Sequence, residues 1–507
     1  MLSKITSFAL KGLEGYPLCI EVDIHNGMPT YDIVGLADTA IKESKERVRS
    51  AIKNSGYNYP VACIVVNLAP ADTKKEGSFY DLPIALATLI ASDQTCQNEQ
   101  MNKFVILGEL SLNGEVRKIS GLLPMLIAAR EQGYTNAIIP QENKEEASFV
   151  DGMNLLPVTS LRQVVEYFEN KTTIQPIECK KWSANAVVTH DTDMKYIHGQ
   201  FIAKRAMEIA VAGGHNILMI GPPGAGKTML ARAVPTIMPD LTFDEALEIA
   251  KIHSIAGVLD GFVHERPFRS PHHTASTVAL TGGGTKVKPG EISLAHNGVL
   301  FMDELPEYSR YTLETLRQPL EDGVITVSRS AGTVTYPSNF MLIASMNPCP
   351  CGHYGSSVHE CKCSPAQIHK YLSKLSGPLV DRIDMHVEVD AVSYQELQSD
   401  NLSEDSATVK SRVNNARSMQ NKRFEGTSVH CNAKMTAPLI KKYCKLDAES
   451  SKLLENAFER LNISARAYNR VLKVARTIAD LDASETILTK HVAEALQYRS
   501  LDKKFLV

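Results

Sequence analysis

The segment His215–Thr228 limits what this chain can fold into more than any other part of the sequence. It begins with a short apolar run, Ile217–Ile220, of the length of a buried strand. Lys227 and Thr228 then open a helical pattern, and the turn between strand and helix consists of Gly221, Pro222, Pro223, Gly224, Ala225 and Gly226. A G-x-x-x-x-G-K-[ST] motif between a strand and a helix is a phosphate-binding loop. We therefore predict an α/β domain with a polyphosphate site.

The residues of this phosphate loop suit ATP. Glycines allow successive backbone N–H groups to turn inward around the phosphates, and the N-terminus of the following helix adds a favourable dipole. Lys227 can reach the β- and γ-phosphates, while the hydroxyl of Thr228 can hold Mg²⁺. The alternative is a glycine-rich turn without chemistry, which the strand–loop–helix setting disfavours.

Two later segments offer the residues that hydrolysis of a nucleotide needs. Gly298–Glu304 is an apolar strand that ends in two acids. We expect Asp303 to complete the Mg²⁺ shell and Glu304 to polarise the attacking water. The next strand, Phe340–Ser345, is followed by Asn347, which is placed to orient that water. The alternative for Asn347 is a turn residue before the following proline.

Two insertions in the same domain carry basic residues. Val324–Tyr336 has two alternating arms, the pattern of a β-hairpin, with Arg329 at its tip. Thr281–Gly290 is glycine-rich and contains Lys286 and Lys288. We expect these three side chains to contact the phosphates of a nucleic acid. The alternative is that they are solvated loop charges.

Two arginines are candidates for stabilising negative charge on the nucleotide. Arg382 lies in Ser376–Asp384. We expect it to contact the γ-phosphate of the nucleotide bound by a neighbouring copy, because negative charge there must be stabilised in the transition state. Its alternative role is a charge cluster with the neighbouring aspartates. Arg466 stands in the first turn of the helix Ser464–Leu481, where the helix dipole opposes a cation. We assign it to the bound nucleotide, with Arg470 in reserve; an exposed helix arginine is the alternative.

Four of the ten cysteines crowd into one loop, which is the pattern of a metal site in a reducing compartment. The spacing is C-x-C, nine residues, C-x-C, and the ligands would be Cys349, Cys351, Cys361 and Cys363. Four thiolates suit a closed, structural Zn²⁺ site, although the spacing departs from the usual C-x₂-C. His353 or His359 could replace one cysteine. The alternative is four reduced thiols in a loop.

Length and composition bound the remaining possibilities. A chain of 507 residues exceeds a single core, and 44% apolar with 22% charged residues is ordinary for a globular protein. The net charge of −3 provides no global basic field, so any nucleic acid must be bound by local patches. The sequence contains no apolar run of membrane-spanning length, and we expect a cytoplasmic protein that does not bind membranes.

The first 170 residues alternate between helical and strand patterns, which predicts a compact α/β domain. Asn113-Gly114 is a hairpin turn, and Ser160 with Gln163 has the spacing of a capping box. The expected helices are Leu36–Asn54, Asp81–Ser92 and Leu122–Gln132, and the expected strands are Val61–Leu68, Phe104–Leu110 and Ala137–Pro140.

This domain resembles the proteolytic domain of Lon-type proteases through Lys75–Tyr80 and Leu112–Leu122. The resemblance implies a ribosomal S5 domain 2-like fold with a serine in the first stretch and a lysine after the second. Phe79 and Met125 occupy those two positions in this sequence. Ser78 is one place away but faces no lysine, and a nucleophile without its base is weak. The resemblance therefore implies a scaffold without protease activity, with peptidase activity as the alternative.

The order of motifs along the whole chain resembles the ComM/YifB family of magnesium-chelatase-like AAA+ ATPases. The segments that carry this resemblance are Gly221–Thr228, Arg269–Ala275, Gly298–Glu304, Asn347–Gly352, Ser376–Asp384 and Ser464–Leu481. It implies a Lon-like domain (1–170), a linker (171–194), an AAA+ core with inserted β-hairpins (195–391) and a helical lid (392–507). The core would contain the cysteine-rich loop 349–363, and the lid would carry Arg466 as its sensor-2 arginine.

The resemblance also implies an activity. Family members would form homo-hexameric rings that bind single-stranded or branched DNA and use ATP to drive branch migration during recombination and natural transformation, with recombination proteins as candidate partners. A chaperone that remodels proteins or inserts metal is a second reading. A scaffold without enzymatic activity is a third, which the full set of ATPase residues disfavours. The small, polar and basic tip of the hairpin favours nucleic acid over polypeptide.

Overall fold

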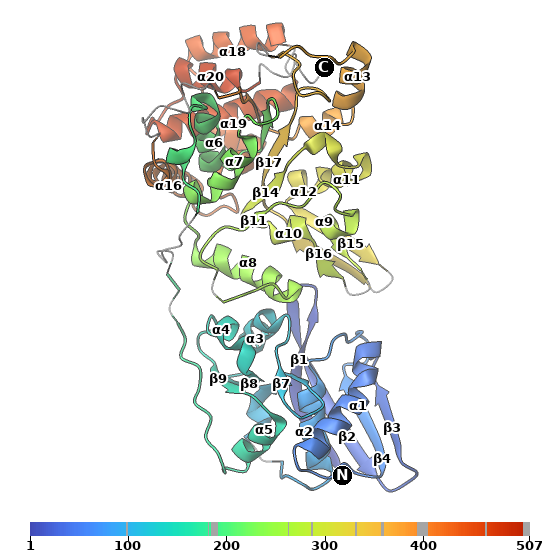
Figure 1. Cartoon of the computed structure of the whole chain (residues 1–507). Helices are drawn as coiled ribbons and strands as arrows, with labels where there is room; N and C mark the ends of the chain where they lie inside the picture. Colours follow the sequence, from blue (N-terminus) through green and yellow to red (C-terminus); the bar gives the residue numbers. More distant parts are fainter. Residues whose placement is uncertain are drawn as a thin grey trace.

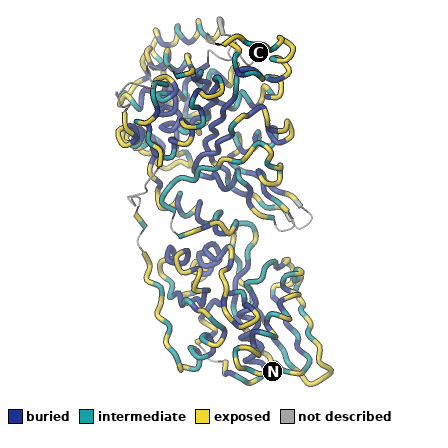
Figure 2. The backbone as a smooth tube through the Cα atoms, viewed as in Figure 1, coloured by how far each residue is buried: buried dark blue, intermediate teal, exposed yellow. Residues whose placement is uncertain are grey.

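The computed structural model describes residues 1–97, 100–180, 182–183, 191–261, 263–284, 287–329, 332–355, 359–392, 404–461 and 464–499, without the side chains of residues 329, 332, 460 and 461. Figure 1 shows two bodies joined by an extended segment. The N-terminal domain forms one end, and the ATPase core with the C-terminal helices forms the other. Buried residues run through the sheets of both bodies (Figure 2).

The N-terminal domain is built on two sheets. The first has the order β1-β2-β4-β3, in which a long antiparallel hairpin leads into a parallel pair. The helix α2 is buried along its whole length and packs on this hairpin, because nearly every one of its residues is apolar. The elements are β1 (Leu2–Lys11), β2 (Glu14–His25), β3 (Thr30–Val34), β4 (Cys63–Ala69), α1 (Thr39–Asn54) and α2 (Asp81–Ala91).

The second sheet is parallel and has the order β5-β8-β9. A small antiparallel pair, β6-β7, forms around the predicted turn, where Gly114 has a φ of +86°. The hydroxyl of Ser160 accepts from the N–H of Gln163 and caps α5 as expected. The elements are β5 (Phe104–Ile106), β6 (Glu109–Leu110), β7 (Val116–Arg117), β8 (Asn136–Pro140), β9 (Asn154–Val158), α3 (Leu122–Glu131), α4 (Lys144–Ala147) and α5 (Leu161–Phe168).

The helices and strands expected in this domain are confirmed to within a few residues, apart from Phe104–Leu110, which is divided into β5 and β6. Residues 1–35, for which no helix or strand was predicted, form β1, β2 and β3. Of the segment expected as a linker, residues 171–180 run beside the N-terminal domain (Figure 1). Trp182 within it packs on Phe243, with ring centroids 6.0 Å apart, and donates to the carbonyl of Val263 at 3.0 Å.

The ATPase core is a five-stranded, all-parallel sheet with the order β11-β14-β17-β10-β18. Its three central strands are fully buried, as the continuous apolar runs predict for a sheet that is covered on both faces. The strands are β11 (Phe268–Arg269), β14 (Val299–Met302), β17 (Met341–Met346), β10 (Ile217–Ile220) and β18 (Met385–Glu388). The helices are α6 (Phe201–Gly213), α7 (Lys227–Ala233), α8 (Phe243–Ala256), α9 (Thr277–Thr281), α10 (Glu291–Leu294), α11 (Arg310–Thr315), α12 (Arg317–Asp322), α13 (Pro365–Leu372) and α14 (Gly377–Val380).

Both predicted insertions form antiparallel strand pairs, which are β12 (Gly282–Gly283) with β13 (Lys288–Pro289) and β15 (Val324–Arg329) with β16 (Gly332–Pro337). The β15-β16 hairpin lies on the side of the core that faces the N-terminal domain (Figure 1). Val334 approaches the β1-β2 turn so closely that a Cβ on Gly12 would lie 2.9 Å from its Cγ1. The hairpin is therefore part of the joint between the two bodies.

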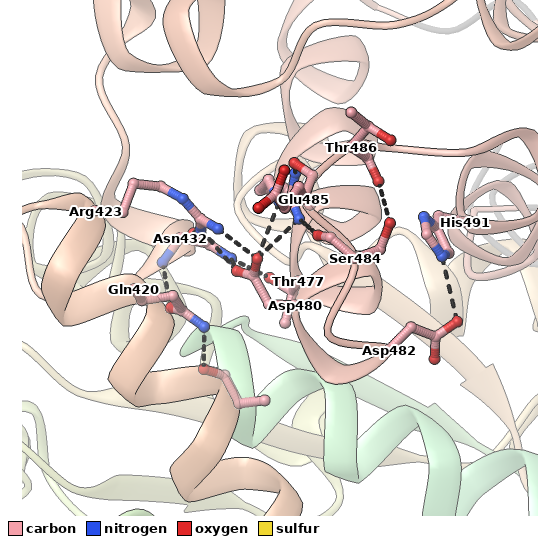
Figure 3. A network of polar contacts seen from close by, with 12 residues as sticks. Gln420, Arg423, Asn432, Thr477, Asp480, Asp482, Ser484, Glu485, Thr486 and His491 are labelled. Carbon is pink, nitrogen blue, oxygen red and sulfur yellow. Dashed lines mark hydrogen bonds and ion pairs between the residues drawn. The ribbon is translucent and has the colours of Figure 1, made fainter.

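The C-terminal helices pack on α6 through α16 and α19. Figure 3 shows the polar network that fixes them. Asp480, on α19, is buried and accepts from Arg423 at 2.7 Å and from Asn432 at 2.8 Å. Thr477 bonds His215, beside the amino end of β10, at 2.8 Å. The helices are α16 (Ser406–Arg423), α17 (Ala437–Tyr443), α18 (Ala448–Leu461), α19 (Ala465–Leu481) and α20 (Thr489–Gln497).

Candidate nucleotide-binding site

The phosphate loop joins the carboxyl end of β10 to the first turn of α7. Gly224 and Gly226 have φ angles of +78° and +87°, a region that other residues rarely adopt. A Cβ added to Gly221 would lie 2.1 Å from the carbonyl oxygen of Val389. The backbone at these three positions therefore requires glycine, as a loop that wraps its N–H groups around phosphates does.

Lys227 is buried in this loop, and its ammonium group is bonded to uncharged oxygens. Its Nζ donates to two carbonyl oxygens of the loop at 2.7 and 2.8 Å and to Oδ1 of Asn347 at 3.1 Å. Burial lowers the pKa of Lys227 to about 8, although the charges of Asp303 and Glu304 oppose that shift. A buried ammonium group bonded mainly to neutral oxygens is well suited to receive the anionic oxygens of a triphosphate.

Thr228 and Asp303 form the pair that would hold Mg²⁺. The Thr228 hydroxyl donates to Oδ2 of Asp303 at 2.9 Å. The hydroxyl of Ser345 donates to the other carboxylate oxygen. A hydroxyl beside an oriented carboxylate fits an ion that takes oxygen ligands. Ser345 was not among the residues predicted from the sequence; its signal is a polar, fully buried residue inside the apolar run of β17.

Glu304 follows Asp303 with a φ of 52°, in the left-handed region. Such conformations cost about 1–3 kcal/mol and concentrate at functional sites. Its side chain is 56% exposed, and one carboxylate oxygen lies 3.6 Å from Nδ1 of His273. The ring of His273 lies 4.1 Å from that of His272. Sequence analysis used these histidines only as a family signature, so it missed the one that adjoins Glu304.

The structure therefore brings five of the predicted residues together at the carboxyl ends of three adjacent strands. They are Lys227 and Thr228 after β10, Asp303 and Glu304 after β14, and Asn347 after β17. Open parallel sheets bind their ligands at this edge. The arrangement can hold a nucleoside triphosphate with Mg²⁺ and place a carboxylate beside it.

Arg382 and Arg466 lie elsewhere, at the amino edge of the sheet. With Arg470 and Lys473 they line a cavity of about 250 Å³. Arg470 pairs at 3.1 Å with Asp384, the residue immediately before β18. Strands rise about 3.3 Å per residue, so the four-residue β10 separates this cavity from the phosphate loop of the same chain. Arg382 and Arg466 therefore lie at the opposite end of β10 from the phosphate loop.

Arg382 is held inside this cavity and is only 12% exposed. One nitrogen pairs with Glu321 on α12, and another donates to the carbonyl of Pro378 at 2.7 Å. Its Nε is buried and has no hydrogen-bond partner among the described residues. Arg466 is exposed at the rim. The cavity lining thus contains four cationic side chains and two acidic ones, Glu321 and Asp381, and this excess of positive charge favours an anion.

The four predicted cysteines form one compact cluster. Their Sγ atoms all lie within 4.8 Å of one another, so they could hold a metal ion. Cys349 is fully buried, and the backbone N–H groups of His353 and Lys362 lower the pKa of the Cys351 thiol. The two histidines named as substitutes, His353 and His359, pack against each other with ring centroids 5.0 Å apart.

The three residues predicted to contact nucleic acid are described only in part. Lys288 is exposed on β13. Lys286 lies outside the described residues, and so does the side chain of Arg329, whose backbone ends β15.

In the N-terminal domain the Lon-like positions hold no catalytic pair. Met125 is fully buried in α3, and Phe79 packs against the domain core. The hydroxyl of Ser78 bonds the carboxylate of Glu109. Ser78 and Glu109 line a cavity of about 480 Å³ between this domain and the β15-β16 hairpin.

The fold and the site together define a P-loop ATPase of the AAA+ type, with a helical domain behind its sheet. Comparison with known families agrees. Residues 193–397 match the model described as magnesium chelatase, subunit ChlI; residues 20–143 match subunit ChlI of Mg-chelatase, and residues 403–499 match the ChlI C-terminal model.

Whole-chain relatives give the family. The chain is 43% identical to an uncharacterised protein, YifB, of Escherichia coli and to the competence protein ComM of Haemophilus influenzae, in each case over 99% of this chain and 98% of the relative. The chain belongs to the ComM/YifB family of magnesium-chelatase-like AAA+ ATPases. It is also 25% identical over 173 residues to a Lon protease of Endomicrobium trichonymphae, covering 32% of this chain and 21% of the protease. This similarity agrees with the Lon-like reading of the N-terminal domain.

Within the described ranges, no helix combines the length and the apolar character that crossing a membrane requires.

Proposed function

We propose that this protein is a cytoplasmic, homo-hexameric DNA motor that uses ATP hydrolysis to drive branch migration of recombination intermediates, including those of natural transformation. The phosphate loop and Lys227 bind the triphosphate, while Thr228 and Asp303 hold Mg²⁺. Glu304 polarises the attacking water, and Asn347 orients it. We assign the metal of the four cysteines as structural Zn²⁺.

The proposal of a ring is supported by the separation of Arg382 and Arg466 from the phosphate loop. Arg382 and Arg466 share an anion-attracting cavity at the amino edge of the sheet, whereas the nucleotide site is at the carboxyl edge. A hydrolysing P-loop site needs an arginine to stabilise negative charge in the transition state. In this proposal, the carboxyl edge of a neighbouring copy's sheet, with its bound nucleotide, packs against this cavity. Arg382 then leaves Glu321 and contacts the γ-phosphate of that nucleotide.

DNA as the polymer is supported by the family and by the basic insertions. The relative from Haemophilus influenzae is named a competence protein. Lys288 is exposed on one insertion, and Lys286 and Arg329 belong to the same two insertions. Contacts of this kind with the DNA backbone give strong salt dependence. Recombination proteins are the partners that this activity would require.

The second candidate is a chaperone that remodels proteins or assists metal insertion. It is favoured by the family models, which are described as magnesium chelatase subunits. The deciding measurement is the rate of ATP hydrolysis with and without single-stranded DNA. Stimulation by DNA supports the motor, and an unchanged rate supports the chaperone. Sizing of the protein with nucleotide and DNA tests the ring, because a monomer under these conditions contradicts it.

A further inference from the structure

Among the described residues, the cysteine cluster is the most complete side-chain constellation outside the nucleotide site, and its sulfur–sulfur distances are close to those of a four-thiolate metal site. Zinc bound by four thiolates at about 2.3 Å in a tetrahedron requires sulfur–sulfur distances of about 3.8 Å. The Sγ of Cys349 lies 3.3 Å from that of Cys351 and 3.7 Å from that of Cys361, and Cys351 and Cys361 are 3.6 Å apart. Cys363 completes the group.

The surroundings of the sulfur atoms also fit a metal-bound thiolate. The backbone N–H of Tyr354 donates to Sγ of Cys349 at 3.3 Å, and two further N–H groups donate to Cys351. Donors aimed at ligand sulfur are the outer-shell contacts that support a bound metal. The four ligands leave no open position, so the role is structural.

This cluster is tied to the nucleotide site in three ways. Cys349 stands two residues after Asn347, which accepts from Lys227. Gly352, between the ligands, is packed so tightly against the phosphate loop that an added Cβ would lie 2.5 Å from Cδ of Pro223. The helix α13 begins at Pro365, two residues after Cys363, and its Tyr371 receives a hydrogen bond from the backbone of Asn347.

We propose that zinc held by Cys349, Cys351, Cys361 and Cys363 is a positioning element of the nucleotide site, so that nucleotide affinity depends on the metal. The metal joins the two ends of the loop 349–363 and thereby fixes Asn347 on one side and Gly352 against Pro223 on the other. On binding, four Zn–S bonds form and the thiol protons pass to solvent. The inference rests on the proposed binding of ATP by the phosphate loop.

The first experiment measures metal and nucleotide on the full chain purified without added zinc. We expect about one zinc per chain, and a Co²⁺-substituted sample should show the visible absorption of a tetrahedral thiolate site. The double variant C361S/C363S should lose the metal and bind a fluorescent ATP analogue about tenfold more weakly, the effect of misplacing one charge-assisted hydrogen bond. Chelation followed by return of zinc should lower and then restore the affinity of the unmodified protein. C96S, which changes an exposed cysteine, should keep both metal and affinity.

A second pair of variants tests the contact between Gly352 and Pro223 while the zinc ligands stay unchanged. Gly352→Ala should retain zinc but weaken nucleotide binding, because the new methyl group displaces the phosphate loop. Gly426→Ala is the matched control, since Gly426 has a φ of +78° close to the +84° of Gly352 but no atom within 4 Å of the added Cβ. It pays the same backbone cost and should leave affinity unchanged.

Two results overturn the inference. One is a chain that contains no zinc and does not bind Co²⁺. The other is a chain that contains zinc but keeps its nucleotide affinity when the metal is removed or Gly352 is replaced. None of these assays contains DNA or requires turnover, so their outcome is independent of the proposed motor activity. If the unmodified chain bound no ATP analogue at all, the proposed function would fail and this inference with it.

Discussion

The N-terminal domain and the ATPase core are both α/β units that are similar to parts of ATP-dependent enzymes. They differ in whether the positions expected to carry catalytic residues hold polar side chains. In the core, strand ends deliver five polar side chains to one edge. In the N-terminal domain, the position of the Lon lysine is Met125, which is fully buried among apolar residues. The N-terminal domain thus has an apolar, packed residue at the position where the Lon resemblance implies a lysine.

The N-terminal domain is attached to the ATPase core by buried contacts between the two bodies. Helix α3 of the N-terminal domain contacts α8 of the core. Glu146 is buried at this joint, and it accepts from the hydroxyl of Ser254, from the N–H of Leu123 at 3.0 Å and from Asn143 at 2.8 Å. Burial raises the pKa of Glu146, although these donors oppose the shift. The N-terminal domain is thus anchored to the ATPase core by a buried carboxyl group whose hydrogen bonds are satisfied.

The sharpest test of this contrast is Lys227→Ala. It removes the ammonium group that meets the triphosphate, and each hydrogen bond to a charged group is worth about 1.5–3 kcal/mol. Nucleotide affinity should fall at least about 100-fold, and ATP hydrolysis should become undetectable. Equilibrium binding of an ATP analogue measures the first, and phosphate release measures the second. Retained hydrolysis would remove the phosphate loop from the mechanism.

Arg382→Ala should separate binding from turnover. Its side chain lies at the amino edge, away from its own phosphate loop, so nucleotide affinity should stay unchanged. Turnover should fall by about 10³-fold, the lower range for loss of an arginine supplied by a neighbour. Arg162→Ala, which removes an exposed side chain of α5 in the N-terminal domain, is the control and should have no effect. Full turnover in the Arg382 variant would contradict the assignment.

Met125→Lys asks whether the N-terminal domain can be returned to the Lon pattern. An unpaired ammonium in the place of a fully buried methionine should destabilise the domain by several kcal/mol. Thermal unfolding should show a lowered transition, and no peptidase activity should appear, because Phe79 still occupies the serine position. A stable variant that cleaves casein would show that the contrast between the two domains depends on a single residue.

The pKa of Lys227 gives the contrast a pH signature. This pKa is lowered by burial from 10.5 to about 8 in the nucleotide-free protein. Phosphate binding requires the charged form, so ATP affinity should be about tenfold weaker at pH 9 than at pH 7. The free energy of unfolding should instead rise with pH between about 8 and 10.5, because in this range the unfolded chain binds more protons at Lys227 than the folded chain does. Titration of affinity and of unfolding at constant ionic strength checks both signs.

Local motifs explain why much of the site could be predicted. Lys227, Thr228 and the two acids after β14 are marked by strand ends, and parallel strands deliver them to one edge. Ser345 is marked only as a polar residue inside the apolar run of β17, and His273 only as part of the segment Arg269–Ala275. Their positions beside Asp303 and Glu304 emerge only when strands and loops are assembled. The position of Arg466 depends on how α19 packs against α6 and the sheet, which are distant in sequence. Sequence analysis placed it at the bound nucleotide without showing which subunit's nucleotide that is.

Some elements of the fold could likewise be predicted from local sequence, whereas others depend on contacts between distant segments. Helices such as α2 and α19 have strong apolar patterns or a clear N-cap at Ser464, so their limits follow from local sequence. The hairpin β1-β2 was not predicted, because its strands are buried by α2 and α3, which come much later in the chain. The closeness of the hairpin β15-β16 to Gly12 is likewise a tertiary fact.

The smallest expected effect completes the comparison. Ser78 donates to Glu109, a carboxylate whose negative charge disfavours a serine alkoxide next to it. A fluorophosphonate probe should therefore leave Ser78 unlabelled, and Ser78→Ala should change neither ATP hydrolysis nor its response to DNA. Mass spectrometry of the probed chain checks the first statement. Labelling of Ser78 would mean that the cavity beside the hairpin retains a reactive nucleophile, and the two domains would then differ in the strength of their chemistry rather than in its presence.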